Sequence, residues 1–364
     1  MKLSEIMALL ETEAPLMLQE NYDNSGLLIG NKNDDISKIL VTIDITEEVV
    51  NEAVEHNCNL IISHHPLIFK PIKSINSDSD TGRSVIKLIK NNIAVYAAHT
   101  NFDNIISGVN GKIAEKLGLI NTKVLQPAEN QLFKIITYAP KIHATHVREA
   151  LFNAGAGNIG NYDKCSYNVE GYGTFRAGSE AHPFIGDINK LHTEPEVRIE
   201  VILPKSIKQK VITALFNNHP YEEPAFDLLA IENQSDRIGA GLIGELPDSL
   251  DEVTFLNFLK SVFNCKVIKH TDFTGKQIKK VALCGGSGSF LLKSAVRTGA
   301  DVYVSGDFKY HDFFDAQNHI LAVDLGHFES EQYTKHIFYE IITKKMPTFA
   351  VRISETKTNP INYL

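Results

Sequence analysis

Three short motifs hold the residues whose types and spacing are suited to chemistry. The first, NLIISHHPLIF, contains the adjacent histidines His64 and His65, and the second, AAHTNFD, ends at Asp103. The third, DLGHFESE, contains His327 and Glu331, which lie four residues apart and share a face if a helix begins there. Imidazole and carboxylate ligands together suit Zn, Mn, Fe or Co better than Ca. These five residues are therefore candidate ligands of divalent metal ions.

Five such groups are too many for one tetrahedral ion with an open position. They suit two divalent ions that are bridged by a carboxylate and lie roughly 3.5 to 4 Å apart, an arrangement that activates water for hydrolysis. Such a pair also explains the adjacent histidines, because side chains that leave a strand end in different directions can each bind a different ion. The alternative is that His64 or His65 is an ordinary polar residue at the end of a strand.

Other polar residues near these motifs have less specific signals. We expect His99, Asp307 and His311 to support the ligands rather than bind metal themselves. The GGSGS segment (285–289) lies at a strand-to-helix turn and is consistent with either an anion-binding loop or a plain tight turn, since it lacks a Walker lysine and full GxGxxG spacing. We interpret HPYEEPAFD (219–227), with two adjacent carboxylates, as a solvated loop with structural prolines.

The elements that must position the candidate ligands follow a repeated plan. A strand pattern at 38–44, helical spacing at 45–57 and a second strand at 59–63 predict a βαβ unit. Residues 279–307 repeat this plan without a gap, and a third strand follows in each half. In open α/β sheets, ligands bind beyond the carboxyl ends of the strands, where all three motifs fall. The sequence therefore predicts two related α/β half-domains that deliver histidines and carboxylates to one end of a sheet.

The two half-domains are separated by an insertion that has its own repeat. Residues 133–155 match residues 197–219, and both copies contain the string ALFN. Each copy reads as strand, turn and helix, and two such βαβ units make a ferredoxin-like (α+β) domain. Polar, turn-rich segments flank this region. We predict a discontinuous α/β core at 1–126 and 236–364 and an inserted domain at 127–235.

The composition restricts the class of protein. Hydrophobic residues make up 43% of the chain and charged residues 22%, which is typical of a folded globular protein. A net charge of -8 argues against binding to nucleic acid or to an anionic membrane surface. No apolar stretch reaches the ~18 to 20 residues needed to span a bilayer, and no signal peptide is expected, so we predict a cytoplasmic protein. The four cysteines have no CxxC spacing, which argues against a zinc ribbon or a disulfide framework.

The motifs, taken in order, resemble those of a known family. They are ENYDNSGLLIG, LIISHHPLIF, AAHTNFD, HPYEEPAFD, GGSGS, SGDFKYHD and DLGHFESE. The chain resembles the dinuclear-metal family of GTP cyclohydrolase I type 2 homologues, also called the NGG-interacting-factor-like family, over nearly its whole length. The combination of HHP with GHxxSE is specific.

The resemblance implies two divalent ions per chain, with zinc as the first choice, held by His64, His65, Asp103, His327 and Glu331. It also implies a toroidal homohexamer. The inserted domain of the longer bacterial members resembles trimer-forming signal proteins and copper-tolerance proteins with ferredoxin-like folds.

Two functions of different classes are consistent with these features. The first is a metal-dependent hydrolase that acts on a purine nucleotide or a related heterocycle. With GTP, attack at C8 of guanine would open the imidazole ring and release formate, with Asp103 or His99 as a proton shuttle. The second is a metal-binding regulatory or sensor ring in which the inserted domain binds a ligand or partner.

The five candidate ligands divide between the two expected ions. Glu331 is the only glutamate among them, and its longer side chain makes it the best candidate for the bridge between the ions. His64 and His65 are then expected to bind separate ions. Asp103 and His327, one from each half-domain, are expected to complete the two sites.

Overall fold

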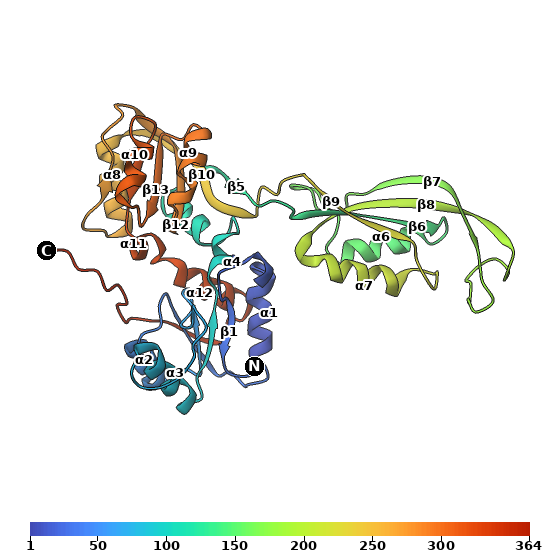
Figure 1. The fold of residues 1–364 in the computed structure, drawn as a ribbon, viewed down its shortest axis with the longest axis horizontal. Helices are drawn as coiled ribbons and strands as arrows, with labels where there is room; N and C mark the ends of the chain where they lie inside the picture. The colour runs from blue at the N-terminus through green and yellow to red at the C-terminus, as the bar shows by residue number, and fades with distance from the viewer. The chain divides into compact units, whose positions relative to one another are not determined.

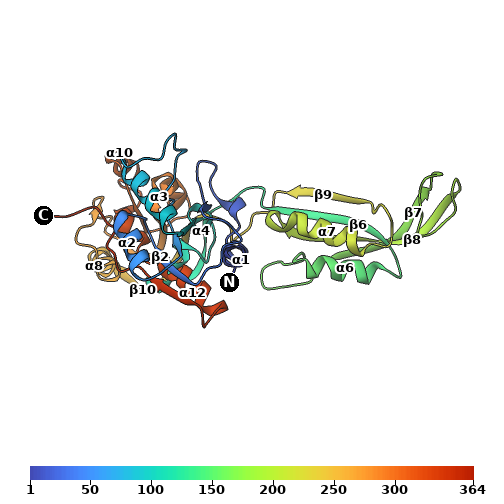
Figure 2. The same cartoon turned by 90° about the horizontal axis from the view of Figure 1, so that it is seen from below.

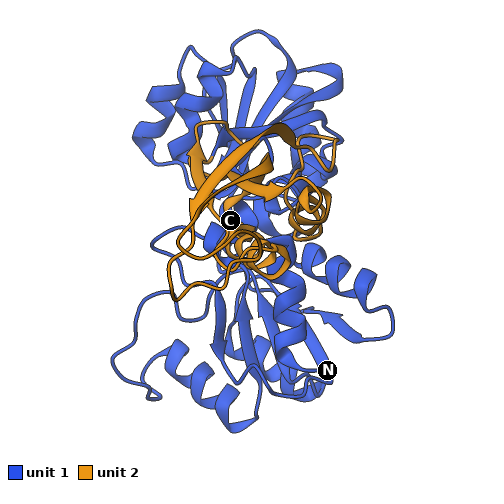
Figure 3. Cartoon of the chain, turned by 90° about the vertical axis from the view of Figure 1, so that its right-hand side faces the viewer, with its two compact units in different colours: residues 1–127, 236–364 blue, residues 128–235 orange.

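The structure is a computed structural model that describes residues 1–364, and these residues form two compact units. Unit 1 comprises Met1–Pro127 and Asp236–Leu364, and unit 2 comprises Ala128–Ser235 (Figure 3). The sequence placed the insertion at 127–235. The fold is a mixed α/β structure with several sheets, which confirms the predicted fold class. No helix of the structure combines the length and apolar character that crossing a membrane requires.

The N-terminal half of unit 1, where α1, α2, α3 and β1 are labelled in Figure 1, is built on a five-stranded sheet. The strand order of this half is β1-β4-β3-β2-β15. Its elements are α1 (Leu3–Glu13), η1 (Leu16–Leu18), β1 (Gly26–Ile29), β2 (Lys38–Thr42), α2 (Glu47–Glu55), β3 (Leu60–Ser63), α3 (Asp80–Lys90), β4 (Ala94–Ala97), α4 (Thr100–Asp103), α5 (Val109–Lys116), α12 (Thr334–Lys345) and β15 (Ala350–Ile353). Strands β15, β2, β3 and β4 are parallel, and β1 pairs with β4 in the antiparallel direction. Because β3 and β4 are buried along their whole length, they read in the sequence as short apolar runs.

The C-terminal half of unit 1 contains a six-stranded sheet in the order β11-β14-β13-β12-β10-β5. Its elements are β5 (Ile120–Pro127), β10 (Gly239–Asp251), α8 (Glu252–Phe263), β11 (Lys269–His270), β12 (Gln277–Ser287), η3 (Ser289–Leu291), α9 (Leu292–Arg297), β13 (Val302–Gly306), α10 (Tyr310–Ala316), β14 (Leu321–Asp324) and α11 (His327–Glu331). Strands β12, β13 and β14 are parallel neighbours in chain order, as β2, β3 and β4 are. Each half of unit 1 therefore has three adjacent parallel strands whose carboxyl ends can position ligands.

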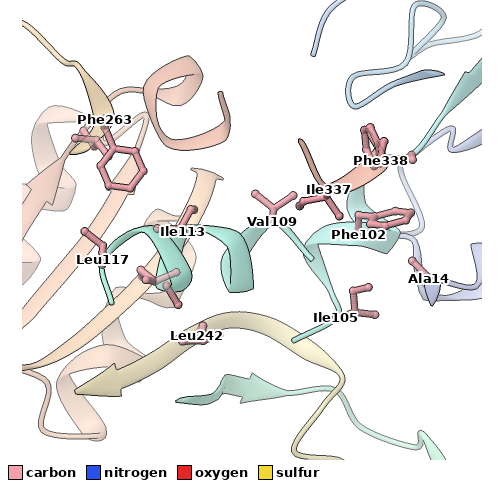
Figure 4. Packing of buried hydrophobic residues seen from close by; sticks show 14 of the residues in the cluster. Ala14, Phe102, Ile105, Val109, Ile113, Leu117, Leu242, Phe263, Ile337 and Phe338 are labelled. Carbon is pink, nitrogen blue, oxygen red and sulfur yellow. The ribbon is translucent and has the colours of Figure 1, made fainter. Parts of the chain in front are cut away.

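One hydrophobic core joins the two halves of unit 1. Val109, Ile113 and the adjoining Leu117 recur at the spacing of one helix face along α5, and all three are buried. Nearby, Phe102 and Phe338 pack edge to face with their ring centroids 5.1 Å apart (Figure 4). Burial of a large apolar side chain contributes about 1.5 to 3 kcal/mol. This shared packing fixes the two sheets against each other.

Unit 2 has a four-stranded antiparallel sheet in the order β7-β8-β6-β9, with two helices on one face (Figure 2). Its elements are β6 (Leu132–Pro140), α6 (Ala144–Asn153), β7 (Tyr167–Arg176), β8 (Leu191–Pro204), η2 (Lys205–Ile207), α7 (Lys208–Asn218) and β9 (Phe226–Ile231). This order of elements is that of a ferredoxin-like fold. The sequence repeat has a packing reason, because Val147 and Leu151 of α6 and the matching Val211 and Leu215 of α7 are all fully buried.

Candidate metal centre

The two adjacent histidines lie just beyond the carboxyl end of β3. Backbone pairing continues past Ser63, since the N–H of His64 donates to Thr42 O at 3.2 Å and that of His65 to Ile43 O at 2.9 Å. Their rings do not diverge to opposite faces of the sheet: the centroids lie 4.9 Å apart, and the ring planes are inclined by 41°. Both imidazoles therefore reach one polar cluster.

Each of the three candidate histidine ligands is held by its Nδ1 atom. The hydrogen-bond pairs are His64 Nδ1 with Ala98 O at 2.9 Å, His65 Nδ1 with Asp44 Oδ1 at 2.6 Å, and His327 Nδ1 with Asp307 Oδ2 at 2.7 Å. In each pair the ring nitrogen donates and the oxygen accepts. An outer acceptor of this kind fixes the ring and leaves the Nε2 lone pair for a metal ion. Asp307 was expected in this supporting role, whereas the role of Asp44 was not predicted.

Glu331 lies at the centre of the cluster and is only 3% exposed. Its Oε2 atom is 3.0 Å from His65 Nε2 and 3.1 Å from His327 Nε2, and its Oε1 atom is 3.7 Å from His64 Nε2. Asp103 Oδ1 is also 3.7 Å from His64 Nε2. The Nε2 atoms of His65 and His327 face each other at 3.3 Å. The structure therefore brings all five sequence-predicted residues together.

The ligand atoms form overlapping groups that suit metal ions. One group is His65, His327 and Glu331, and another is His64, Asp103 and Glu331; within each group the ligand atoms all lie within 4.8 Å of one another. Glu331 belongs to both groups. The structure thus contains candidate histidine and carboxylate clusters for metal binding.

Several buried polar atoms in the cluster have no hydrogen-bond partner. They are His64 Nε2, Asp103 Oδ1 and Glu331 Oε2, the last of which has no hydrogen bond of acceptable geometry despite its short distances to two imidazoles. A buried polar group without a partner costs about 1 to 3 kcal/mol. A divalent cation among these atoms would satisfy all three, and three imidazoles with two carboxylates suit Zn, Mn, Fe or Co. The residues present therefore fit the metal ions that the sequence implies.

The charged groups of the cluster shift one another's pKa values. Burial raises the pKa of Glu331, but the surrounding imidazoles outweigh burial and hold this pKa well below its usual value. Burial and the neighbouring Glu331 carboxylate raise the pKa of Asp103 to about 7. Burial lowers the pKa values of His65 and His327, but their carboxylate partners outweigh it and raise them to about 10 and about 9. Without metal, protons therefore supply the positive charge that Glu331 needs.

The GGSGS segment makes room for the central carboxylate. A Cβ atom added to Gly286, which has a φ of +61°, would lie 2.2 Å from Glu331 Oε1. Two backbone N–H groups of this turn are already used, because Gly285 donates to Asn110 Oδ1 and Gly286 to Ser330 Oγ, both at 2.9 Å. The segment is therefore a tight turn that packs against Glu331.

Two more histidines of the motifs have different positions. His99 donates from Nδ1 to Asp23 Oδ1 at 2.7 Å, and one of its ring nitrogens lies within 4.8 Å of ligand atoms of His64 and His65. His99 therefore lies next to the candidate ligands His64 and His65 and is not an outer hydrogen-bond partner of either ring. His311 lies exposed on α10 and contacts the rings of Tyr310 and Phe314, so the expectation that it supports the ligands is wrong.

A cavity of about 430 Å³ opens beside the cluster. Its lining includes His99, Asp103, His327 and Glu331. Two aromatic residues on its wall, Tyr22 and Phe290, are 66% and 64% exposed. The thiol of Cys284 also lines it, and burial raises the pKa of that thiol. The volume is in the range of small-molecule sites in proteins.

The chain is similar to known proteins over nearly its whole length. A family model described as Duf34/NIF3 (NGG1p interacting factor 3) matches residues 1–360. The chain is 40% identical over 370 aligned positions to a Bacillus subtilis protein named "GTP cyclohydrolase 1 type 2 homolog", with 99% of this chain and 98% of that protein covered. A Halalkalibacterium halodurans protein of the same name is 38% identical, with the same coverage.

A crystal structure of a Bacillus cereus protein described as related to NIF3 has 38% identity to this chain and a TM-score of 0.88. The match covers 100% of this chain and 99% of that one. The fold, the motifs and these relatives agree with the resemblance seen in the sequence. The chain therefore belongs to the Duf34/NIF3 (NGG1p interacting factor 3) family.

Proposed function

We propose that this protein is a dinuclear divalent-metal hydrolase that acts on a purine nucleotide or a related heterocycle. The observation that carries the proposal is the position of Glu331, which is shared by two groups of candidate ligands. His65 and His327 would hold one ion with Glu331, and His64 and Asp103 would hold the other. When bound, such a pair of ions activates water and polarises the bond that is cleaved. Zinc is the first candidate, followed by Mn, Fe and Co.

The residues that line the cavity beside the cluster favour a planar substrate. The exposed rings of Tyr22 and Phe290 offer faces on which a heterocyclic base can stack. The relatives named as GTP cyclohydrolase homologues suggest GTP as the first compound to test. In that reaction, one water adds at C8 of guanine and the imidazole ring opens by cleavage of the C8–N9 bond to give a formamide on N7. A second water then hydrolyses the formamide, so that C8 leaves as formate and N7 becomes a free amine.

His99 is placed to move a proton during this reaction. Asp23 accepts the Nδ1 hydrogen of His99 and also accepts from Ser25 and Thr100, so the carboxylate is fixed by several donors. This hydrogen bond leaves His99 Nε2 as the basic atom, and the residue lines the cavity. We assign proton transfer to this atom. General acid–base catalysis by a positioned side chain contributes about 10² to 10⁴-fold in rate.

The proposed activity is tested with metal-loaded protein and GTP. Formate release and the absorbance of a pterin product are followed, with Glu331→Ala as the metal-site control. Turnover that the control lacks supports GTP as a substrate, and no turnover above the control removes it. A His99→Gln variant should keep its metal content and lose about 10² to 10⁴-fold in rate. An unchanged rate in that variant would exclude His99 as the proton carrier.

A second candidate function is a metal-binding regulatory ring in which unit 2 binds a ligand. The observation that favours it is a cavity of about 830 Å³ within unit 2. For either function we propose a homohexamer, which light scattering would detect as six times the chain mass of 40.5 kDa. A monomer or dimer in solution would contradict that assembly.

A further inference from the structure

The HPYEEPAFD segment of unit 2 forms one wall of the 830 Å³ cavity. The segment joins α7 to β9 and is anchored by His219, which is buried. His219 Nε2 donates to Tyr138 O at 2.9 Å, and its Nδ1 accepts the N–H of Tyr221 at 3.1 Å. The interpretation of this segment as a solvated loop is thus only partly correct. Glu222 and Glu223 are exposed, but the segment is held in place and lines a site.

Aromatic rings cover much of this cavity. Phe175 and Phe184 lie with their ring centroids 6.0 and 6.5 Å from that of Tyr221. Phe184 is 52% exposed, and Tyr172, also on the wall, is 79% exposed. The rings of His143 and His192 lie 5.3 Å, centroid to centroid, from those of Phe184 and Phe175, respectively. The exposed parts of the large aromatic side chains offer π faces in a concave site. Such faces bind apolar groups and, because their potential is negative, cations.

The charged groups on the wall are mostly of one sign. The lining contains five glutamates and one arginine. Arg198 pairs with Glu200, which is outside the lining, at 2.9 Å, and Glu170 pairs with Lys141 at 2.9 Å. The other four carboxylates form no ion pair: Glu180, Glu196, Glu222 and Glu223. The cavity therefore has an excess of negative charge beside its aromatic rings, which disfavours phosphates and other anions.

Glu196 is positioned by contacts on two sides. Its Oε1 atom accepts the hydroxyl hydrogen of Tyr221 at 2.7 Å. On its other side lies the backbone of β7, where a Cβ atom at Gly173 would be 2.1 Å from Glu196 Oε2. A glycine at this position leaves space for the carboxylate on the strand. The wall thus combines a fixed negative charge with aromatic faces.

We propose that this cavity binds a small organic cation, an ammonium or guanidinium compound whose charge is balanced by Glu196 and whose hydrocarbon part lies against Phe175 and Phe184. Aromatic rings with carboxylates are the usual protein environment for such cations. The inference does not depend on the proposed hydrolase activity. It supplies the class of ligand that a regulatory function of unit 2 would need.

Calorimetric titration of the full-length protein tests this site. The probes are choline, agmatine and spermidine, with 3,3-dimethyl-1-butanol as a neutral compound of the same shape as choline. We expect saturable binding of at least one cation and at least about 10-fold weaker binding of the neutral compound than of choline. No saturable binding of any cation up to about 10 mM, or equal binding of choline and its neutral analogue, would overturn the proposal.

Substitutions in the lining of the cavity test whether the cation binds there. Glu196→Gln keeps the shape of the side chain and removes its charge, so we expect cation binding to weaken about 10-fold or more. Phe184→Ala should weaken it as well. Matched controls are Glu232→Gln and Tyr162→Ala, which alter exposed residues of the same unit outside the cavity. Circular dichroism checks that each variant is folded. Unchanged binding in folded Glu196→Gln and Phe184→Ala, or equal loss in the controls, would show that the cation binds elsewhere.

The same titration with Glu331→Gln separates this site from the metal centre. Cation binding should persist in that variant, because no ligand of the centre lies in unit 2. Loss of the cation together with the metal would contradict an independent site. Failure of GTP turnover leaves this result unaffected, since the readout is binding alone.

Discussion

The candidate metal centre of unit 1 and the cavity of unit 2 hold their charged groups in different ways. In the metal centre, Glu331 is buried and each candidate imidazole ligand is fixed through its Nδ1 atom. In the cavity, most carboxylates are exposed, and Glu196 is fixed by Tyr221 and by the space above Gly173. Imidazoles and carboxylates are combined in the first region, whereas carboxylates dominate the second.

This difference indicates two kinds of ligand. Small cations with strict geometry require ligands that are positioned before binding, and outer hydrogen bonds supply that order. A larger organic ligand gains its affinity from area and from a few charges, so open aromatic walls suffice. Substitutions in each region can therefore show whether the two regions are as distinct as their structures indicate.

The largest expected effect is that of Glu331→Gln on metal content. Because Glu331 belongs to both groups of candidate ligands, its loss should weaken both sites, each by more than about 100-fold, beyond the ~10 to 100-fold typical of outer partners. Elemental analysis after dialysis should find almost no metal. Glu55→Gln, which changes an exposed carboxylate on α2, is the matched control. Two ions per chain in folded Glu331→Gln would exclude the bridging role.

Terminal ligands should each control one ion. Asp103 is grouped with His64, and His327 with His65, so Asp103→Asn and His327→Ala should each retain about one ion per chain. X-ray absorption spectra of the two variants should differ, because the remaining ion has different ligands. If Asp103→Asn lost both ions while Glu331→Gln kept them, Asp103 would be the bridge.

Outer hydrogen-bond partners should have intermediate effects. Asp44 accepts from His65 and also from the hydroxyl of Thr358, at 2.7 Å. Asp44→Asn should weaken the ion at His65 by about 10 to 100-fold, and Thr358→Val by less, because Thr358 acts only through Asp44. Competition with a chromogenic chelator measures both affinities. Equal effects of the two substitutions would argue against this chain of contacts.

Metal affinity should rise with pH. In the metal-free protein the pKa values of His65 and His327 are raised to about 10 and about 9, so protons compete with the ions at neutral pH. At a pH below these pKa values, each proton that the metal ion must displace makes the apparent metal affinity rise about tenfold for every unit of increase in pH. The stability that these protonated groups give the metal-free protein is complete below about pH 6.5 and is lost as pH rises through about 9 to 10. An affinity for Zn that stays constant between pH 6 and pH 8 would refute this competition.

Deletion of unit 2 should have the smallest effect on the metal centre. Pro127 on β5 and Gly239 on β10 are directly opposite each other in an antiparallel pair, so a short turn can close the chain after removal of residues 128–235. The shortened protein should keep its metal content and lose cation binding. Loss of metal from a folded deletion variant would show that the two regions are not independent.

The sequence predicted candidate metal ligands in each half of unit 1, because parallel strands place their carboxyl ends at one edge of a sheet. His64, His65 and Asp103 come after β3 and β4 of one sheet, and His327 and Glu331 come after β14 of the other. The rule therefore applies within each half, whereas the packing that brings the ends of the two sheets together at the cluster was not evident from residue spacing. The outer partners were harder to find. Asp44 also follows a strand, β2, but only its distance to His65 Nδ1 reveals its role.

The cavity of unit 2 was harder to predict from the sequence, because the sheet of this unit is antiparallel and its strand ends do not all lie at one edge. The repeat of unit 2 predicted the order of strands and helices, since the same core positions recur in α6 and α7. The cavity depends instead on where a hairpin and two loops meet, which residue spacing does not reveal. In the same way, His311 shares a motif with Asp307, yet α10 directs it to solvent.

The central claim is that two ions share Glu331. The most direct test is an anomalous-scattering crystal structure of the protein purified without added metal. We predict two anomalous peaks about 3.5 to 4 Å apart, each within bonding distance of a different oxygen of Glu331, with His64 on one ion and His65 on the other. A single peak, or two peaks bridged by a residue other than Glu331, would contradict the account.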